Sequence, residues 1–498
     1  MRRYSLALCL ATTMFFGGCA TVTNPVTGKA EHTVMDERSE IAEGAKAHQQ
    51  ILATFGEYQD PKVQAYVNDV GQRLAKASHR PQLDWHFTVL DSPEVNAFAL
   101  PGGYVYVTRG IMAYMDNEAD LAGVIGHEIG HVAARHGSQR ATRQQKAGIG
   151  VLVATILGVV LESQGLPGAA NAASQASQGV AAGYVARYSR EQESQADKLG
   201  AEYLTRVNYD PHNMVDVIKL LENQERFAAD QARAEGRAPR EGGSDWLASH
   251  PTSEKRLRDI TQIANEYKGE ANYSDAGHAR YLEAINGLVF ADSREQGVTR
   301  GQNFYHEPLG IAFTAPPGWK IQNSPEALAF VNAEGNAALI VRAVPPKAGN
   351  THEEIIRNAV QPQSGKLEHH TFNGLPATHF SGTVKNERGQ PQPVELTIAT
   401  GPSNQNFAFI YAAKDRQSLQ RSYRQLQDAE SSFRAMNDAD HEAARPWKLT
   451  TVPMPAGGFA ELAKRSPLTN HAERQLRLLN GVYGGGEIKA GERVKVVE

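Results

Sequence analysis

Cysteine is almost absent from this sequence of 498 residues, which contains two, Cys9 and Cys19, both near the N-terminus. A disulfide framework is therefore excluded for the rest of the chain, whose stability must come from packing. Charge of one sign is not in excess either, because 51 basic residues face 55 acidic ones and the formal net charge is -4. This balance creates no global field, so we expect no nucleic-acid partner and look for function in local motifs.

A membrane-spanning apolar run is missing from the N-terminus, where a basic start precedes an apolar stretch over residues 4–16 that is too short to cross a bilayer. This pattern predicts an export signal over residues 1–18. The signal ends in FGGC, which resembles the lipobox of bacterial lipoproteins, so Cys19 would be lipidated and residues 19–35 would form a tether. Ala20 is typical of sorting to the outer membrane in such families. The expected location is the periplasm, with a lipid anchor in the outer membrane; the alternative is a plain secretory signal.

The first half of the chain has a mainly helical pattern. Apolar residues recur at helical spacing over residues 36–79, which predicts two amphipathic helices. The segments WHFTVLD and GGYVYVTRG alternate as strands do, and residues 101–103, Pro-Gly-Gly, mark the turn before the second strand. Helical spacing then returns from Asp116 to about Val207. We therefore predict an α+β fold whose first domain is mainly helical with a small β-hairpin or sheet.

Two smaller units are predicted in the second half. Residues 303–437 mix strands with one amphipathic helix, which indicates a small α+β domain that is distantly similar to PsbP-like domains. Residues 449–498 resemble a degenerate LysM module, although the usual Gly-Asp-Thr-Leu opening is missing. Glycan binding and a structural or protein-docking role both stay open for this C-terminal unit. Neither unit contains a recognisable catalytic constellation.

The segment HEIGH places a glutamate between two histidines. Residues four apart on a helix lie on one face, so His127 and His131 can hold one metal ion. Glu128, beside the first histidine, can reach a water on that ion without being a ligand. This arrangement follows the His-Glu-x-x-His logic of zinc peptidases, and a catalytic zinc needs a third protein ligand as well.

The third ligand has to come from elsewhere in the chain. A metzincin would have a histidine where this chain has Gly137, and His136 is predicted to face away, about 140° around the helix. A later helical segment, RYSREQESQADKLGAEYL, offers Glu193 as a ligand and Asp197, on the same face, as a partner for a ligand histidine. Two more carboxylates of this segment stay open as alternatives: Glu191 and Glu202.

These motifs together resemble the HtpX/BepA-type zinc endopeptidases, the family of the CAAX prenyl proteases. Besides HEIGH and R-x-x-E-x-x-A-D, the segments VNAFALPGGYVYVTRG and SHPTSEKR agree with the family over roughly residues 36–265. The resemblance implies a gluzincin-type metallopeptidase domain over residues 36–280 with one Zn²⁺ per chain. It also implies a role for each residue of the site: metal ligands His127, His131 and Glu193, general base Glu128, and Asp197 behind a ligand histidine.

The resemblance implies two further features. In such relatives a histidine in the position of His250 can occupy the open zinc position and restrain the enzyme; alternatively, His250 only shapes a helix N-terminus. The strand before the active helix can serve as an edge to which an extended substrate adds by backbone hydrogen bonds. Here that strand contains Tyr104, Val105, Tyr106 and Val107, and its alternative is an ordinary core strand.

The expected function is a zinc endopeptidase of the cell envelope that hydrolyses unfolded or misassembled envelope and outer-membrane proteins. The alternative, from a different class, is an envelope scaffold or chaperone with a latent peptidase site. Such a scaffold would bind peptidoglycan or the outer-membrane assembly machinery through the C-terminal units.

Overall fold

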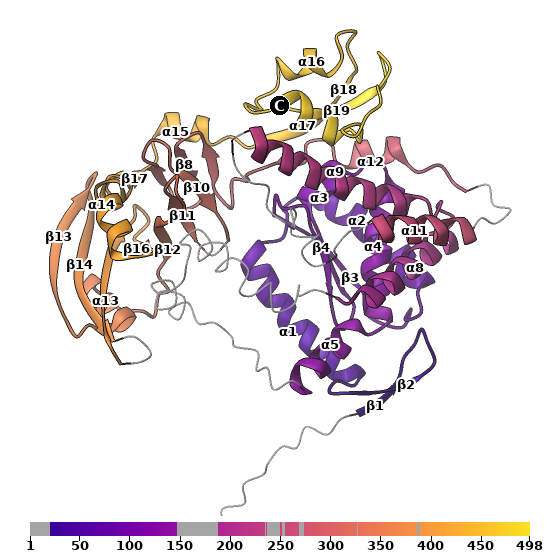
Figure 1. Cartoon of the computed structure of the whole chain (residues 1–498), viewed down its shortest axis with the longest axis horizontal. Helices are drawn as coiled ribbons and strands as arrows, with labels where there is room; N and C mark the ends of the chain where they lie inside the picture. Colours follow the sequence, from indigo (N-terminus) through magenta and orange to yellow (C-terminus); the bar gives the residue numbers. More distant parts are fainter. Residues whose placement is uncertain are drawn as a thin grey trace, which may run out of the picture.

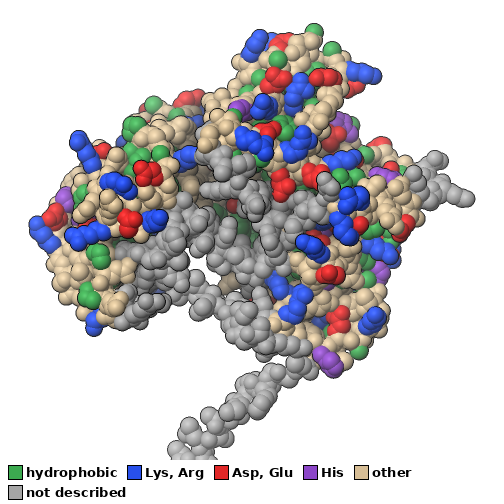
Figure 2. All heavy atoms as spheres, in the orientation of Figure 1, with side chains coloured by type: hydrophobic (Ala, Val, Ile, Leu, Met, Phe, Trp, Pro, Cys, Tyr) green, Lys and Arg blue, Asp and Glu red, His purple; other side chains and the backbone are tan. Residues whose placement is uncertain are grey.

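The computed structural model describes residues 20–146, 188–234, 236, 250, 254–267, 273–325, 327–385 and 389–498. The predicted signal and Cys19 lie outside the described residues. The chain is a mixed α and β structure, as predicted, with a helix-rich unit, a sheet-rich unit and a C-terminal segment (Figure 1). Figure 2 shows basic and acidic side chains interspersed over the face drawn. Among the described helices, none is both long and apolar enough to cross a membrane.

The helix-rich unit contains the candidate site. Two amphipathic helices open it where they were predicted, and Asp36 and Asp60 cap them by accepting hydrogen bonds from backbone N–H groups. The hairpin β1 (Ala20–Thr23) and β2 (Ala30–Thr33) precedes them. The described helices of this unit are α1 (Glu37–Phe55), α2 (Pro61–Ala77), α3 (Arg109–Tyr114), α4 (Glu118–Ala133), α5 (His136–Lys146), α8 (Arg190–Arg206), α9 (Asn213–Ala234), α11 (Glu254–Glu266) and α12 (His278–Ala284).

A three-stranded sheet packs beside these helices, in the order β3-β5-β4. Strand β3 (His86–Leu90) runs parallel to β5 (Tyr104–Thr108), while β4 (Ala97–Leu100) runs antiparallel to it. The sequence did not indicate β4, which is apolar throughout and buried at all four positions. The prediction that Tyr104, Val105, Tyr106 and Val107 form an edge is therefore wrong, because β5 is paired on both sides.

Helices α4 and α8 approach each other closely because glycines line their contact. A Cβ on Gly126 would lie 3.4 Å from the Cα of Gly200, and a Cβ on Gly130 would lie 3.1 Å from the carbonyl oxygen of Ala196. Larger side chains at these positions would push the helices apart. The small residues thus let two helices that are far apart in the sequence bring their polar side chains together.

The sheet-rich unit contains two antiparallel sheets and two covering helices. A seven-stranded sheet has α13 (His352–Val360) on one face and α14 (Arg416–Ser431) on the other, since alternate residues of β12 belong to different apolar clusters. Its strands are β10 (Lys320–Asn323), β11 (Leu328–Val331), β12 (Ala337–Ala343), β16 (Asn406–Ala413), β15 (Pro391–Thr400), β14 (Leu375–Lys385) and β13 (Ser364–Phe372). A four-stranded sheet adjoins it: β17 (Arg434–Ala435), β9 (Ile311–Thr314), β8 (Asn303–His306) and β7 (Val298–Arg300).

The C-terminal segment follows the short helix α15 (Asp438–Ala443) and packs onto the helix-rich unit over α3 and α9 (Figure 1). Its strand β18 (Trp447–Pro453) pairs with β6 (Val289–Phe290) and with the final strand β19 (Arg493–Val497). Apolar side chains of α16 (Gly458–Ala463) and α17 (Ala472–Leu479) belong to the same buried cluster as those of α4 and α8. The segment expected to be a separate unit therefore shares the core of the helix-rich unit.

Candidate metal centre

Helices α4 and α8 supply His127, His131 and Glu193 to the centre, and the local sequence determines where each helix begins. Asn117 caps α4 by accepting a hydrogen bond from the backbone N–H of Asp120. Ser189 and Gln192 form a capping box at the start of α8, which places Glu193 in its first turn. In α4 the two histidines lie about two and a half and three and a half turns after the first residue, on one face that packs against α8.

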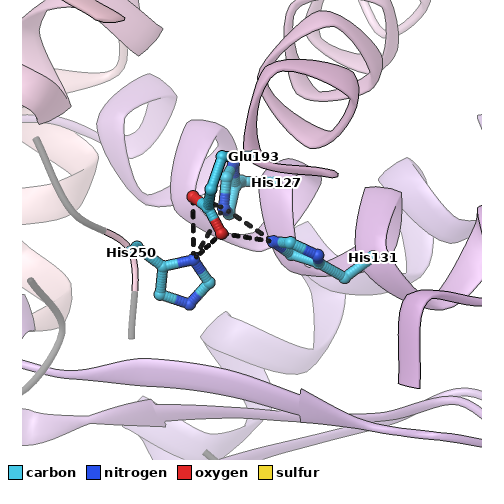
Figure 3. Close-up of side chains that lie close together, drawn as sticks. All are labelled: His127, His131, Glu193 and His250. Carbon is cyan, nitrogen blue, oxygen red and sulfur yellow. Dashed lines mark hydrogen bonds and ion pairs between the residues drawn. The ribbon is translucent and has the colours of Figure 1, made fainter. Parts of the chain in front are cut away.

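Four side chains point toward one another at this contact (Figure 3). The Nε2 atoms of His127 and His131 are 3.1 Å apart, and the Nε2 of His127 is 3.2 Å from the Nδ1 of His250. That Nδ1 lies 2.9 Å from an oxygen of Glu193, which in turn lies 3.5 Å from the Nε2 of His131. A tetrahedral ion with bonds of about 2.0–2.1 Å separates its ligand atoms by about 3.3 Å. These four groups therefore have the spacing of a four-coordinate metal site.

The chemistry of this group fits a divalent cation. All four side chains are buried, and each directs a nitrogen or a carboxylate oxygen at one point, so three imidazoles and one carboxylate form a donor set that suits zinc. Burial lowers the pKa of His131 well below its usual value, and the neighbouring histidines lower it further, which favours the neutral ring that binds metals.

Arg256 neutralises part of the negative charge around the centre. Its Nε and NH2 nitrogens donate to the two oxygens of Asp197 at 2.9 and 2.8 Å, and NH2 also lies 3.2 Å from Glu193. Burial would raise the pKa of Asp197 and of Glu193, but Arg256 and the neighbouring histidines lower both below their usual values. If Glu128 is ionised too, three buried carboxylates face one guanidinium, and a divalent cation would neutralise the difference.

Asp197 and Glu128 lie on either side of this group of four side chains. The Nδ1 of His127 lies 2.9 Å from Asp197, so this ring directs its other nitrogen, Nε2, toward the centre. A carboxylate oxygen of Glu128 lies 3.6 Å from the Nε2 of His250. The ring of His250 thus faces the ligand group with one nitrogen and Glu128 with the other.

His136 does not face away, contrary to the prediction. Helix α4 ends at Ala133 and the chain turns through Arg135, whose φ is 60°, so the helical extrapolation fails. Helix α5 begins at His136, and the Nδ1 of His136 lies 2.8 Å from the Nδ1 of His131. Burial lowers the pKa of His136 to about 4. Residues 134–136 are Ala-Arg-His, none of which is a helix breaker, so this turn is not predictable from the residue types.

The two carboxylates that the sequence left open as alternatives to Glu193 have different surroundings. Glu191 is exposed, and Glu202 forms an ion pair with Arg206. Glu193 alone of the three carboxylates considered belongs to the ligand group. Sequence reasoning also missed Tyr188, whose ring stacks on that of His131 with centroids 3.9 Å apart.

Comparison with known proteins finds similarity over the helix-rich unit. Residues 61–264 match the model of peptidase family M48. The "Beta-barrel assembly-enhancing protease" of Yersinia pestis is 28% identical over 272 residues, 54% of this chain and 52% of that protein. Its namesake in Escherichia coli O157:H7 is 30% identical over 247 residues, 49% and 48% of the two chains. The "Mitochondrial metalloendopeptidase OMA1" of Arabidopsis thaliana is 30% identical over 188 residues, 38% and 33% of the two chains.

The chain spans about half the length of the first two curated relatives. Among solved structures, cyanobacterial PsbP from Synechocystis sp. PCC 6803 matches with 16% identity and a TM-score of 0.20, over 28% of this chain and 98% of that one.

Proposed function

We propose that this chain is a zinc endopeptidase of the bacterial cell envelope, because residues 61–264 match the model of peptidase family M48, a family of metallopeptidases. Its substrates are unfolded or misassembled envelope and outer-membrane proteins. The observation that carries the proposal is the convergence of His127, His131 and Glu193 beside Glu128, all buried. Three protein ligands with one further position are what a catalytic zinc requires.

The residues divide the chemistry among them. A zinc ion held by His127, His131 and Glu193 would lower the pKa of a water and polarise the scissile carbonyl. Glu128 would accept the proton of the attacking water and deliver it to the leaving nitrogen. Asp197 would keep the Nε2 lone pair of His127 directed at the ion by accepting the hydrogen of Nδ1.

His250 restrains this site in the proposed resting state. Its Nδ1 lies among the ligand atoms, and its Nε2 faces Glu128, so the ring stands between the general base and the metal position. The attacking water needs that same space. NH1 of Arg256 donates to the backbone carbonyl of His250 at 3.0 Å, which holds the ring in place. Cleavage would require the backbone at His250 to move away.

An extended substrate would bind along β4 instead of β5. Strand β4 pairs with one described strand, β5, and it packs against α4, which carries the two histidines. None of the described strands pairs with the other edge of β4, where an extended chain would add as a further strand. This mode favours unfolded chains, since a folded surface rarely presents an extended segment with free N–H and C=O groups.

The proposed location rests on the N-terminal sequence and on the relatives. The lipobox-like FGGC would place Cys19 at a lipid anchor in the outer membrane, facing the periplasm. Two relatives are named as proteases that enhance β-barrel assembly, which suggests contact with the outer-membrane assembly machinery. Peptidoglycan is a further proposed partner, through the C-terminal segment.

The test uses the chain without its lipid anchor and measures zinc content and cleavage of unfolded casein. Glu128→Gln should keep zinc and lose about 10²–10⁴-fold in rate, while Glu193→Gln should lose zinc. His250→Ala should keep zinc and cleave faster than the wild type. Glu191→Gln, a change at an exposed carboxylate of the same helix, is the matched control and should change neither property. Cleavage by Glu128→Gln at the wild-type rate would refute the mechanism, and zinc without cleavage in every sample would favour a scaffold.

A further inference from the structure

One ligand histidine of the proposed zinc site has an unusual partner. His127 faces a carboxylate, whereas the Nδ1 of His131 faces the Nδ1 of a third, fully buried histidine, His136. The far nitrogen of that ring, Nε2, lies 3.0 Å from the side-chain oxygen of Gln195 on α8. The three side chains are thus linked in sequence by two hydrogen bonds, from His131 through His136 to Gln195.

If His131 binds a metal through Nε2, only one distribution of hydrogens over the rings of His131 and His136 is possible. An amide oxygen accepts hydrogen bonds only, so the Nε2 of His136 must donate to Gln195. The Nδ1 of His136 then accepts, and the Nδ1 of His131 donates to it. His131 is left with a lone pair on Nε2, the atom that points at the other ligands.

Aromatic packing also restrains the ring of His131. The ring of Tyr188 stacks on that of His131, with centroids 3.9 Å apart and planes inclined by 18°. Tyr188 immediately precedes Ser189, the residue that caps α8, so the helix carrying Gln195 also fixes this tyrosine. A carboxylate in the place of His136 would orient His131 as well, but it would add a further buried negative charge to a centre that already contains three carboxylates.

We infer that His136 and Gln195 are positioning residues, which set the tautomer and orientation of His131 through a neutral hydrogen-bonded relay. This inference rests on the proposed zinc site. It assigns to His136 a role in metal affinity without direct contact with the ion. The expected consequence of breaking the relay is a loss of zinc affinity of about 10–100-fold.

The experiment measures zinc affinity by competition with a chromophoric chelator, and the visible spectrum of the cobalt-substituted protein, on the full chain without its lipid anchor. His136→Leu should weaken zinc binding about 10–100-fold and alter the cobalt spectrum. His136→Asn should restore most of the affinity, because its amide oxygen can accept from the Nδ1 of His131. Gln195→Leu, a change at a partly exposed position, should weaken binding in the same direction. His79→Ala, a half-buried histidine bonded to Tyr203, is the control and should leave both readouts unchanged.

Three results would overturn the inference. Wild-type affinity and spectrum in His136→Leu would show that the relay has no effect on the metal. Equal losses in the leucine and asparagine variants would show that packing, not the hydrogen bond, is what matters. Should His136→Leu fail to fold, wild-type affinity in Gln195→Leu would refute the relay by itself. Failure of the wild type to bind zinc would instead refute the proposed function, so the two failures are distinguishable.

Discussion

Replacing Arg256 with methionine should lower the free energy of unfolding by about 3–5 kcal/mol, the usual cost of removing one partner from a buried ion pair. The side chain is 7% exposed and Asp197 is 2% exposed, so water cannot replace the lost hydrogen bonds. Arg256 binds both oxygens of Asp197 and one of Glu193, and it donates to the carbonyl of His250. The substitution leaves two buried carboxylates without their cationic partner.

The loss of unfolding free energy in Arg256→Met should depend on pH. In the wild type the folded pKa of Asp197 lies below its unfolded value, so the stabilisation is present above about pH 4 and is lost as the pH falls. In Arg256→Met the guanidinium no longer opposes the effect of burial, so the folded protein accepts a proton on Asp197 more readily. The difference between the two proteins should therefore shrink as the pH is lowered from about 7 to about 4.

The assay is urea unfolding of the metal-free proteins in a chelator, since a bound metal would add its own stabilisation. Arg258→Met is the matched control, because Arg258 is exposed on the same helix, and it should change the unfolding free energy by less than about 0.5 kcal/mol. The unfolding free energy of Arg256→Lys should lie between those of the wild type and Arg256→Met, since lysine keeps the charge but cannot bind both oxygens. Equal unfolding midpoints for Arg256→Met and Arg258→Met would refute the charge balance described for the centre.

Three further predictions concern the scaffold. Gly200→Val should cost about 1–3 kcal/mol and weaken zinc binding in chelator competition, because a Cβ there would lie 3.2 Å from the backbone nitrogen of His127. Burial raises the pKa of Asp120 to about 7, so stability should fall as the pH rises from about 4 to about 7, and Asp120→Asn should flatten that slope in unfolding curves. Phe459→Ala should cost about 3–5 kcal/mol and lower the melting temperature of the whole helix-rich unit, whereas a separate early transition in calorimetry would contradict the shared core.

Helical spacing explains which side chains of the candidate site can be grouped from the sequence alone. Two residues four apart on a helix share a face whatever surrounds them, which placed His127 with His131 and Glu193 with Asp197. The position of His136 could not be predicted in the same way, because it depends on a turn at Arg135. None of residues 134–136 is a helix breaker that would predict this turn. The rule of helical spacing holds only while the helix continues.

Strand order was harder to predict than strand location. The alternating pattern of β5 was visible in the sequence, but β4 is a short run of four buried apolar residues that could equally belong to a helix. The pattern of residues 104–108 fits an edge strand and a core strand equally well, and the family resemblance favours the edge. The Pro-Gly-Gly turn over residues 101–103 in fact joins β4 to β5 as a hairpin.

The C-terminal segment could not be assigned because an apolar helix face has the same pattern whether it covers its own module or a neighbour. A specific contact connects the C-terminal segment to the helix-rich unit. The buried Lys495 of β19 donates to the backbone carbonyl groups of Ala113 and Met115, which precede the N-cap residue of α4. A fragment that begins near residue 446 would expose the apolar side chains that this contact covers. Binding of such a fragment to peptidoglycan would therefore not distinguish recognition from adhesion of an unpacked surface. The partner of this segment has to be sought with the full chain, using surface substitutions that leave Lys495 and Phe459 in place.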